Sequence, residues 1–214
     1  MKKVAIMPIK LNNERLPGKN TKLLNGKPLL CHQLEMLKSL KAFDGIYVYC
    51  SNESIVPLLP EGISFLKRPD YLDLPTSNFT QIFESFMQTI DADIYAYAHA
   101  TAPFITAETV KKELDAVLSG KYDSAFCASK IQDFLWQDNE PLNFDAQNLP
   151  RSQDIKPIYR ETSGVYVFTK FVFKKYHRRI GEKPYIVEVS YKEAVDINEP
   201  NDFVLAELFA KEYK

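Results

Sequence analysis

Apolar and polar positions along this chain form blocks that predict strands and helices in turn. Short continuous apolar runs predict buried strands, and they lie at 4–7, 45–50, 63–66, 93–98, 122–128, 164–168 and 185–189. Apolar residues spaced three or four positions apart predict amphipathic helices, which lie at 30–37, 79–90, 107–118 and 200–209. Strands and helices that alternate in this way favour an α/β fold, with a mostly parallel sheet and helices on both faces.

Residue types at the predicted helix starts indicate where the helices begin. Thr76 or Ser77 can cap the helix at 79–90 with a side-chain oxygen. Thr106 can cap the next helix, and Pro200 suits the first position of the last one, because the N–H group that proline lacks has no helical partner there. We therefore expect these helices to begin close to those positions.

The alternating pattern is interrupted from about residue 129 to residue 163. Residues 132–151 are polar and aromatic, contain prolines, and follow neither a strand period nor a helix period. We expect an excursion from the main sheet here, with the chain returning to the sheet at 164–168. At 214 residues, 45% of them hydrophobic, the chain has the size of one domain. The prediction is a single domain, residues 1–214, that carries this excursion.

Composition excludes several classes of partner. A net charge of −1 gives no electrostatic case for nucleic acid. No apolar run approaches the roughly 20 residues that span a bilayer, and no signal peptide precedes Val4, so we expect a cytoplasmic protein without a membrane partner. Cys31, Cys50 and Cys127 are widely spaced and form no CxxC pair, which predicts buried, reduced thiols.

The first predicted strand leads into a polar loop that is rich in cations. The loop carries one acid, Glu14, against four cations, which are Lys10, Arg15, Lys19 and Lys22. Ligands of open α/β sheets bind at the carboxyl ends of the strands, where this loop begins. Four cations on one connection suit a polyanionic ligand such as a nucleoside triphosphate. The alternative is a solvated basic loop without a ligand.

A second candidate site lies late in the chain. Asp196 follows the short apolar step Ala194-Val195 and directly precedes the last helix. A carboxylate in that position can hold Mg²⁺, which nucleotidyl transfer needs to neutralise the triphosphate and the departing pyrophosphate. The alternative is a helix cap or an ion-pair acid. If the strand at 185–189 is a parallel neighbour of the first strand, Asp196 faces the cationic loop.

Further motifs follow the other predicted strands. His99 directly follows the strand at 93–98, so it is a candidate for substrate contact, with a satisfied buried histidine as the alternative. Four shorter motifs occur in order along the chain, and they are RP at 68–69, RSQD at 151–154, YRETSGVY at 159–166 and VDINEPND at 195–202.

Taken together with LPGKN at 16–20 and GKPL at 26–29, these motifs resemble those of the cytidylyltransferases that make CMP-activated 2-keto sugar acids, the CMP-sialic acid and CMP-Kdo synthetases. The resemblance extends from Val4 to about Leu208. It implies a Rossmann-like nucleotidyltransferase fold, Mg²⁺ as cofactor, and CTP and a sialic acid-like keto sugar acid as substrates. It also implies a homodimer formed through the excursion at 129–163, where Phe134 and Trp136 are apolar anchors.

The resemblance implies roles for individual residues. Residues expected to bind CTP are Lys10, Arg15, Lys19, Asn20, Arg68 and Ser77. Residues expected to face the sugar acid are His99, Gln153, Tyr159 and Arg160. Residues expected to hold Mg²⁺ are Asp196 and Asn198. Residues expected to take part in catalysis are Lys19, Arg151 and Asp196.

The chain departs from the pattern of this family at several positions. Glu14 stands where the family has Lys, Ile105 where it has Arg, and Asn198 where it has a second acid, and the glycines of the first loop are missing. Two alternatives therefore stay open. One is a related nucleotidyltransferase that uses another nucleoside triphosphate or a sugar 1-phosphate, and the other is a nucleotide-binding homologue without catalysis.

Overall fold

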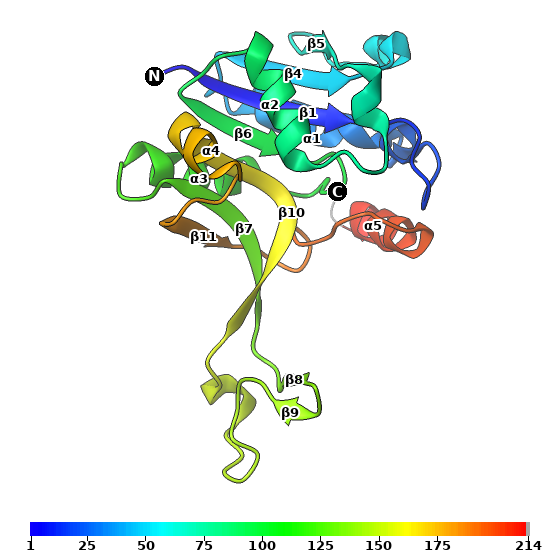
Figure 1. Ribbon diagram of the computed structural model, residues 1–214. Helices are drawn as coiled ribbons and strands as arrows, with labels where there is room; N and C mark the ends of the chain where they lie inside the picture. The colour runs from blue at the N-terminus through cyan, green and yellow to red at the C-terminus, as the bar shows by residue number, and fades with distance from the viewer. Residues whose placement is uncertain (213–214) are drawn as a thin grey trace.

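A seven-stranded sheet forms the centre of the computed structural model, which describes residues 1–212 (Figure 1). Its strand order is β11-β7-β10-β6-β1-β4-β5. The strands are β1 (Lys3–Ile9), β4 (Gly45–Cys50), β5 (Ser64–Lys67), β6 (Ile94–Ala98), β7 (Ser124–Ile131), β10 (Ile158–Thr169) and β11 (Pro184–Glu188). Only β10 runs antiparallel to its neighbours β6 and β7, so the predicted mostly parallel sheet is confirmed.

Helices cover both faces of this sheet. Successive residues of β1 point to opposite faces, because side chains alternate along a strand: Ala5 and Met7 join one apolar core, while Val4 and Ile6 join the other. The first core is closed by α1 (Leu29–Ser39) and α3 (Ala107–Leu118), and the second by α2 (Phe79–Thr89) and α4 (Lys170–Tyr176). The predicted α/β class is therefore confirmed.

A third, smaller core lies where the last helix meets the first loop. Phe203 of α5 (Pro200–Glu212) packs there with Leu24 and Ile197. This core joins the two ends of the chain that carry the candidate sites. None of the helices within residues 1–212 is long and apolar enough to cross a lipid bilayer.

The helix starts agree with the sequence in two of three cases. Thr106 caps α3 by accepting a hydrogen bond from the Thr109 N–H group, and Pro200 is the first residue of α5. The cap predicted for α2 was wrong, because neither Thr76 nor Ser77 fills that position. Asn78 caps the helix in a reciprocal pair with Gln81, at 3.0 and 3.1 Å. A glutamine three positions after the cap completes this arrangement, which a serine at 77 is one residue too early to form.

Helix α4 was not predicted, because its seven residues are too few to reveal a helical period. Of the minor elements, the short strands pair as β2 (Leu23–Leu24) with β3 (Lys27–Pro28) and as β8 (Trp136–Gln137) with β9 (Glu140–Pro141). The 3₁₀ helices are η1 (Lys19–Thr21), η2 (Glu53–Leu58), η3 (Asp70–Asp73) and η4 (Ser152–Asp154). The three cysteines are buried free thiols, as predicted.

An arm projects from the body between β7 and the second half of β10 (Figure 1). The paired ends of β7 and β10 form its base, and a register shift between Glu161 and Tyr166 separates that base from the part of β10 that joins the central sheet. Its outer part contains the β8–β9 pair and η4. Trp136 and Leu149 are 59% and 66% exposed there, so the arm presents large apolar side chains to solvent.

Candidate active site

The cationic loop after β1 folds back on itself. Gly18 adopts a left-handed conformation, with φ of 67°, directly before η1. A residue with a side chain would be strained in this conformation. The Asn20 side chain donates a hydrogen bond from Nδ2 to the backbone oxygen of Lys10 at 2.8 Å. Lys19 and Asn20 are buried as a result. The sequence forms this compact loop locally, through one glycine and one asparagine.

A cavity of about 330 Å³ opens beside this loop, and we refer to it as the loop cavity. Three cations line it, Lys10, Arg15 and Lys19, together with Glu14 and, from far along the chain, Asn198. Lysine and arginine side chains are the usual binders of phosphate groups. The loop cavity therefore has the charge and size to receive a polyphosphate.

Two hydrogen bonds tie the loop to the segment before α5. The Lys19 side chain donates from Nζ to the backbone oxygen of Ile197 at 2.7 Å, and Arg15 donates from its NH2 nitrogen to Asn198 Oδ1 at 3.1 Å. Burial lowers the pKa of Lys19, while the nearby Asp196 carboxylate acts in the opposite direction. The cations of the loop and the late acid thus share one site.

Asp196 carries an oxygen that has no protein partner. Its Oδ2 accepts a hydrogen bond from Asn198 Nδ2 at 2.7 Å, but its Oδ1 is buried and accepts none from the residues that the structure describes. A buried carboxylate oxygen without a partner is costly, so this oxygen is a candidate ligand for a cation.

The donor set beside Asp196 suits Mg²⁺ held together with a substrate. Within residues 1–212 no three His, Cys, Asp or Glu side chains converge on a metal position. Mg²⁺ is usually bound through one or two carboxylates plus phosphate oxygens, and Asp196 can supply one such carboxylate. Asn198 accepts a hydrogen bond from Arg15 at Oδ1 and donates from Nδ2 to Asp196, which orients that carboxylate. The contact of Asn198 with a metal remains a prediction.

Asp196 reaches the loop by a route that the sequence did not suggest. The strand before it, β11, is not a neighbour of β1, because β7, β10 and β6 lie between them. Residues 189–198 instead run back across the sheet, with Val189 N–H bonded to Ala128 and Ile197 N–H bonded to Thr101 at 2.8 Å. This crossing carries Asp196 from the edge of the sheet to its centre.

A larger cavity, of about 560 Å³, lies on the other side of Asp196 and Asn198, and we call it the arm-base cavity. Asn198 lines both cavities. Three parts of the chain line the arm-base cavity. They are the base of the arm at Arg160–Ser163, residues 189–198, which we call the crossing segment, and α5 with Asp202, Leu205 and Phe209. Among the residues that the structure describes, it therefore offers one cation, Arg160, together with three carboxylates, hydroxyl groups and an apolar wall.

His99 lies partly buried just beyond β6, beside a cation that the sequence analysis did not identify. Arg179 approaches His99 Nε2 at 3.4 Å, donates to Glu161 at 3.3 Å, and stacks over the Tyr166 ring at 3.6 Å. Burial, followed by the charge of Arg179, lowers the pKa of His99 to about 4. His99 is therefore neutral near pH 7 and is suited to hydrogen bonding rather than to charge pairing.

Two nucleotide-binding candidates, Arg68 and Ser77, line neither cavity. Arg68 is almost fully buried and forms an ion pair with Asp73, while its Nε has no partner among the described residues. Ser77 donates from Oγ to the backbone oxygen of Tyr71 at 3.2 Å. Their contact with the nucleotide remains a prediction.

The sugar-binding candidates are divided between the body and the arm. Arg160 lines the arm-base cavity and donates from Nε to Ser129 at 3.3 Å. Tyr159, at the base of the arm, donates to Glu188 at 3.3 Å. Gln153 lies in η4, and Arg151 directly precedes it. Arg151 forms an ion pair with Asp154 at 2.7 Å and is largely exposed. Arg151 and Gln153 line neither cavity of their own chain.

Sequence reasoning also missed polar residues that shape the site. Asp202 accepts hydrogen bonds from the N–H groups of Asn198 and Glu199, at 2.9 and 2.8 Å, and lines the arm-base cavity. Its spacing from Glu199 is that of a helix-start acid, a signal that could have identified it. Arg179 has no such signal, because its contacts with His99 and Glu161 come from distant parts of the chain.

A mostly parallel sheet, a cationic loop after its first strand and an unpartnered carboxylate that faces the loop define a nucleotide-binding α/β protein. Among solved structures, the fold is similar to that of "CMP:2-keto-3-deoxy-manno-octonic acid synthetase complexed with CTP". The TM-score is 0.74 at 17% identity, over 99% of this chain and 100% of that one. The predicted nucleotidyltransferase fold is confirmed.

The sequence profile described as "Cytidylyltransferase" matches residues 4–207, and the chain belongs to this family. The predicted family is thereby confirmed. N-acylneuraminate cytidylyltransferase of Oncorhynchus mykiss is 24% identical over 95% of this chain and 49% of its own length. CMP-N,N'-diacetyllegionaminic acid synthase of Legionella pneumophila is 26% identical over 97% of this chain and 95% of its own length. The chain spans about half the length of the N-acylneuraminate cytidylyltransferases that it matches.

Proposed function

We propose that this protein transfers CMP from CTP to a 2-keto sugar acid of the sialic acid kind, releasing pyrophosphate, for the synthesis of surface glycans. The anomeric hydroxyl of the sugar attacks the α-phosphorus in line, so an O–P bond forms as the bond to pyrophosphate breaks and the hydroxyl proton departs. The observation that carries this proposal is Asp196, whose Oδ1 has no partner among the described residues and which lines the arm-base cavity beside Asn198, a residue that lines both cavities.

The nucleotide occupies the loop cavity in this proposal. Lys10, Arg15 and Lys19 hold the phosphates. The hydrogen bonds from Lys19 to Ile197 and from Arg15 to Asn198 already fix two of these side chains, which supports a preorganised phosphate site. Asn20, Arg68 and Ser77 are assigned to the base or ribose. The name of the similar solved structure, which is in complex with CTP, supports the choice of nucleotide.

Mg²⁺ is assigned to Asp196 Oδ1, with Asn198 in support. When bound, the ion neutralises charge on the triphosphate and on the pyrophosphate that leaves. Asp196 provides the negative charge for the ion, and the Asn198 amide holds that carboxylate in place from Oδ2. Lys19, with its ammonium group next to Asp196, stabilises the charge that develops on the phosphates.

The sugar acid occupies the arm-base cavity. Arg160 is suited to its carboxylate, and Glu161, Thr162 and Ser163 are suited to its hydroxyl groups. Leu205 and Phe209 offer an apolar wall for an acyl or deoxy substituent. The relatives are named for N-acylneuraminic, diacetyllegionaminic and pseudaminic acids, which supports the class of substrate and leaves the particular acid to experiment.

The arm makes a homodimer part of the proposal. Arg151 and Gln153 lie on it, outside both cavities of their own chain, and reach a sugar only if the arm meets a second copy. The exposed Trp136 and Leu149 are apolar groups of the kind that interfaces bury.

The direct test is product formation. The protein is incubated with CTP, Mg²⁺ and one of four acids (N-acetylneuraminic, diacetyllegionaminic, pseudaminic or Kdo), and CMP-sugar and pyrophosphate are measured by mass spectrometry and a coupled assay. We expect CMP-sugar with at least one acid. Binding of CTP without any product would indicate a nucleotide-binding homologue, and product from a sugar 1-phosphate would indicate a related nucleotidyltransferase.

A further inference from the structure

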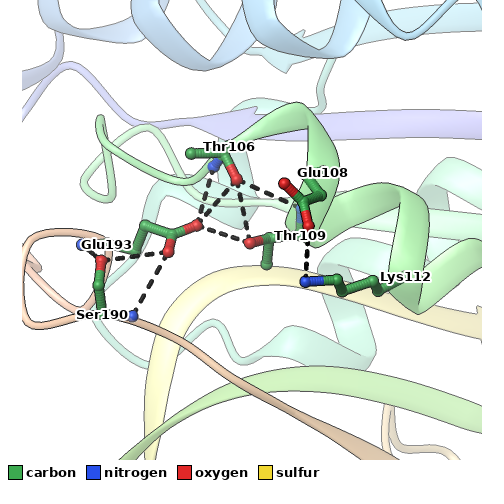
Figure 2. A network of polar contacts seen from close by, with 6 residues as sticks. All are labelled: Thr106, Glu108, Thr109, Lys112, Ser190 and Glu193. Carbon is green, nitrogen blue, oxygen red and sulfur yellow. Dashed lines mark hydrogen bonds and ion pairs between the residues drawn. The ribbon is translucent and has the colours of Figure 1, made fainter.

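A half-buried carboxylate, Glu193, lies three residues before Asp196 and holds the crossing segment to a helix start (Figure 2). Glu193 Oε1 accepts hydrogen bonds from Thr109 Oγ1 at 2.6 Å, from Thr106 Oγ1 at 3.0 Å and from Thr106 N–H at 3.3 Å. Its Oε2 accepts from Ser190 Oγ at 3.2 Å and from Ser190 N–H at 3.4 Å. One side chain thus joins residues 190–193 to the start of α3.

The charge of Glu193 is stabilised where it lies. The amino end of a helix carries partial positive charge and free N–H groups, which favour an anion. Burial alone raises the pKa of Glu193, but the hydrogen bonds from Thr109, Thr106 and Ser190 outweigh it and hold that pKa below its usual range. Glu193 is therefore ionised at neutral pH.

Glu193 is not needed as the cap of α3. Thr106 already fills that position, since its Oγ1 accepts a hydrogen bond from the Thr109 N–H group at 3.3 Å. The additional bonds to Glu193 therefore serve the crossing segment rather than the helix.

The crossing segment depends on such anchors. Residues 189–198 contain neither a helix nor a strand, so no ladder of backbone hydrogen bonds fixes them. Glu193 anchors the segment on one side of Asp196. On the other side, Ile197 is held through its N–H group to Thr101 at 2.8 Å and through its oxygen to Lys19 at 2.7 Å. Asp196 lies between these two anchors.

We propose that Glu193 is a positioning residue that, by tying the crossing segment to the start of α3, fixes the direction in which Asp196 presents its free oxygen to a divalent cation. This inference rests on the proposed function, in which Asp196 holds Mg²⁺. Groups behind a metal ligand set its orientation, and a displacement of about 1 Å at such a site is costly. Glu193 itself lines neither the loop cavity nor the arm-base cavity.

The test measures how Mg²⁺ strengthens CTP binding, by isothermal titration of the intact protein with CTP over a series of Mg²⁺ concentrations. Glu193→Ala removes the anchor, and Glu193→Gln retains one acceptor oxygen but cannot accept from Ser190 with its amide nitrogen. Thr109→Val is nearly isosteric and removes the 2.6 Å bond to Glu193, together with the 3.1 Å bond that Thr109 Oγ1 accepts from Thr106 Oγ1. Glu108→Gln is the control, because Glu108 lies in the first turn of the same helix, is exposed, and forms an ion pair with Lys112 at 2.8 Å.

For Glu193→Ala we expect a rise of about tenfold or more in the Mg²⁺ concentration that gives half of the full increase in CTP affinity. A loss of this size is typical when a group that orients a metal ligand is removed. Glu193→Gln and Thr109→Val should give smaller increases, Glu108→Gln none, and CTP binding without Mg²⁺ should be unchanged in all four. If the Glu193 and Thr109 variants keep the Mg²⁺ dependence of the wild type and lose only thermal stability, the inference is wrong. If the wild type itself shows no Mg²⁺-dependent CTP binding, the proposed function fails as well.

Discussion

Lys19 donates a hydrogen bond to the backbone oxygen of Ile197, 178 positions further along the chain, at 2.7 Å. This bond joins the cationic loop after β1 to the segment that carries Asp196. An ammonium group has three donors, so Lys19 can keep this bond and still donate to a phosphate. The cations proposed to bind phosphate and the carboxylate proposed for the metal are therefore held as one unit before any ligand arrives.

Asp196→Asn should reduce CMP-sugar formation at least about a hundredfold, which corresponds to about 2.7 kcal/mol of transition-state stabilisation. The reason is that Asp196 carries the unpartnered oxygen proposed for the ion, and Asn198 stands where the family has a second acid. Turnover is measured at saturating Mg²⁺, with Asp115→Asn on the exposed side of α3 as control. A variant within a few-fold of wild type would place the metal elsewhere.

CTP should bind more than tenfold more tightly than ATP, GTP or UTP, a difference of about 1.4 kcal/mol for each decade. The membership of this chain in the cytidylyltransferase family is the basis of this expectation. Thermal-shift titration with each of the four nucleotides in the presence of Mg²⁺ provides the comparison. Equal stabilisation by UTP or GTP would contradict a preference for the cytosine base.

Light scattering should show a homodimer at tens of micromolar, a concentration at which an obligate dimer persists. Trp136→Asp should shift the protein toward monomer, because it places a charge among the apolar side chains of the arm. Val56→Asp changes an exposed apolar residue of η2 on the body and should leave the dimer intact. A wild-type monomer under these conditions would refute the role given to the arm.

Glu113 should make stability depend on pH. Its carboxyl is fully buried beside the Cys127 thiol, and burial raises its pKa to about 8. Above about pH 4.5 the unfolded chain releases this proton while the folded protein keeps it, so the free energy of unfolding falls as pH rises. The loss is about 1.4 kcal/mol per pH unit and ends near the folded pKa.

Glu113→Gln removes this titration, so between pH 5 and pH 8 its melting temperature should fall less than that of the wild type. Parallel melting curves across this range, with Glu108→Gln as an exposed control on the same helix, test the effect. Equal slopes for wild type and Glu113→Gln would mean that Glu113 ionises normally in the folded protein.

Several features of the site could be predicted because they are encoded locally. The cations Lys10, Arg15 and Lys19 follow one buried strand, and chain connectivity alone places them at its carboxyl end. Asp196 was identified by its position before a helix that begins at Pro200. The cap of α2 was assigned wrongly because Ser77 and Asn78 are adjacent and both residue types cap helices, so only the observed pair with Gln81 distinguishes them.

The sequence by itself determined most elements of the sheet and of the longer helices, since the period of apolar residues in each depends only on neighbours in the chain. It could not determine which distant elements meet. The crossing of residues 189–198 back to Thr101, the ion pair of Arg179 with Glu161, and the anchoring of Glu193 at the start of α3 all join residues from separate parts of the chain. Strand order and long-range packing set these contacts, and only the tertiary structure decided that the segment after the edge strand β11 would bring Asp196 back to Lys19 at the centre of the sheet.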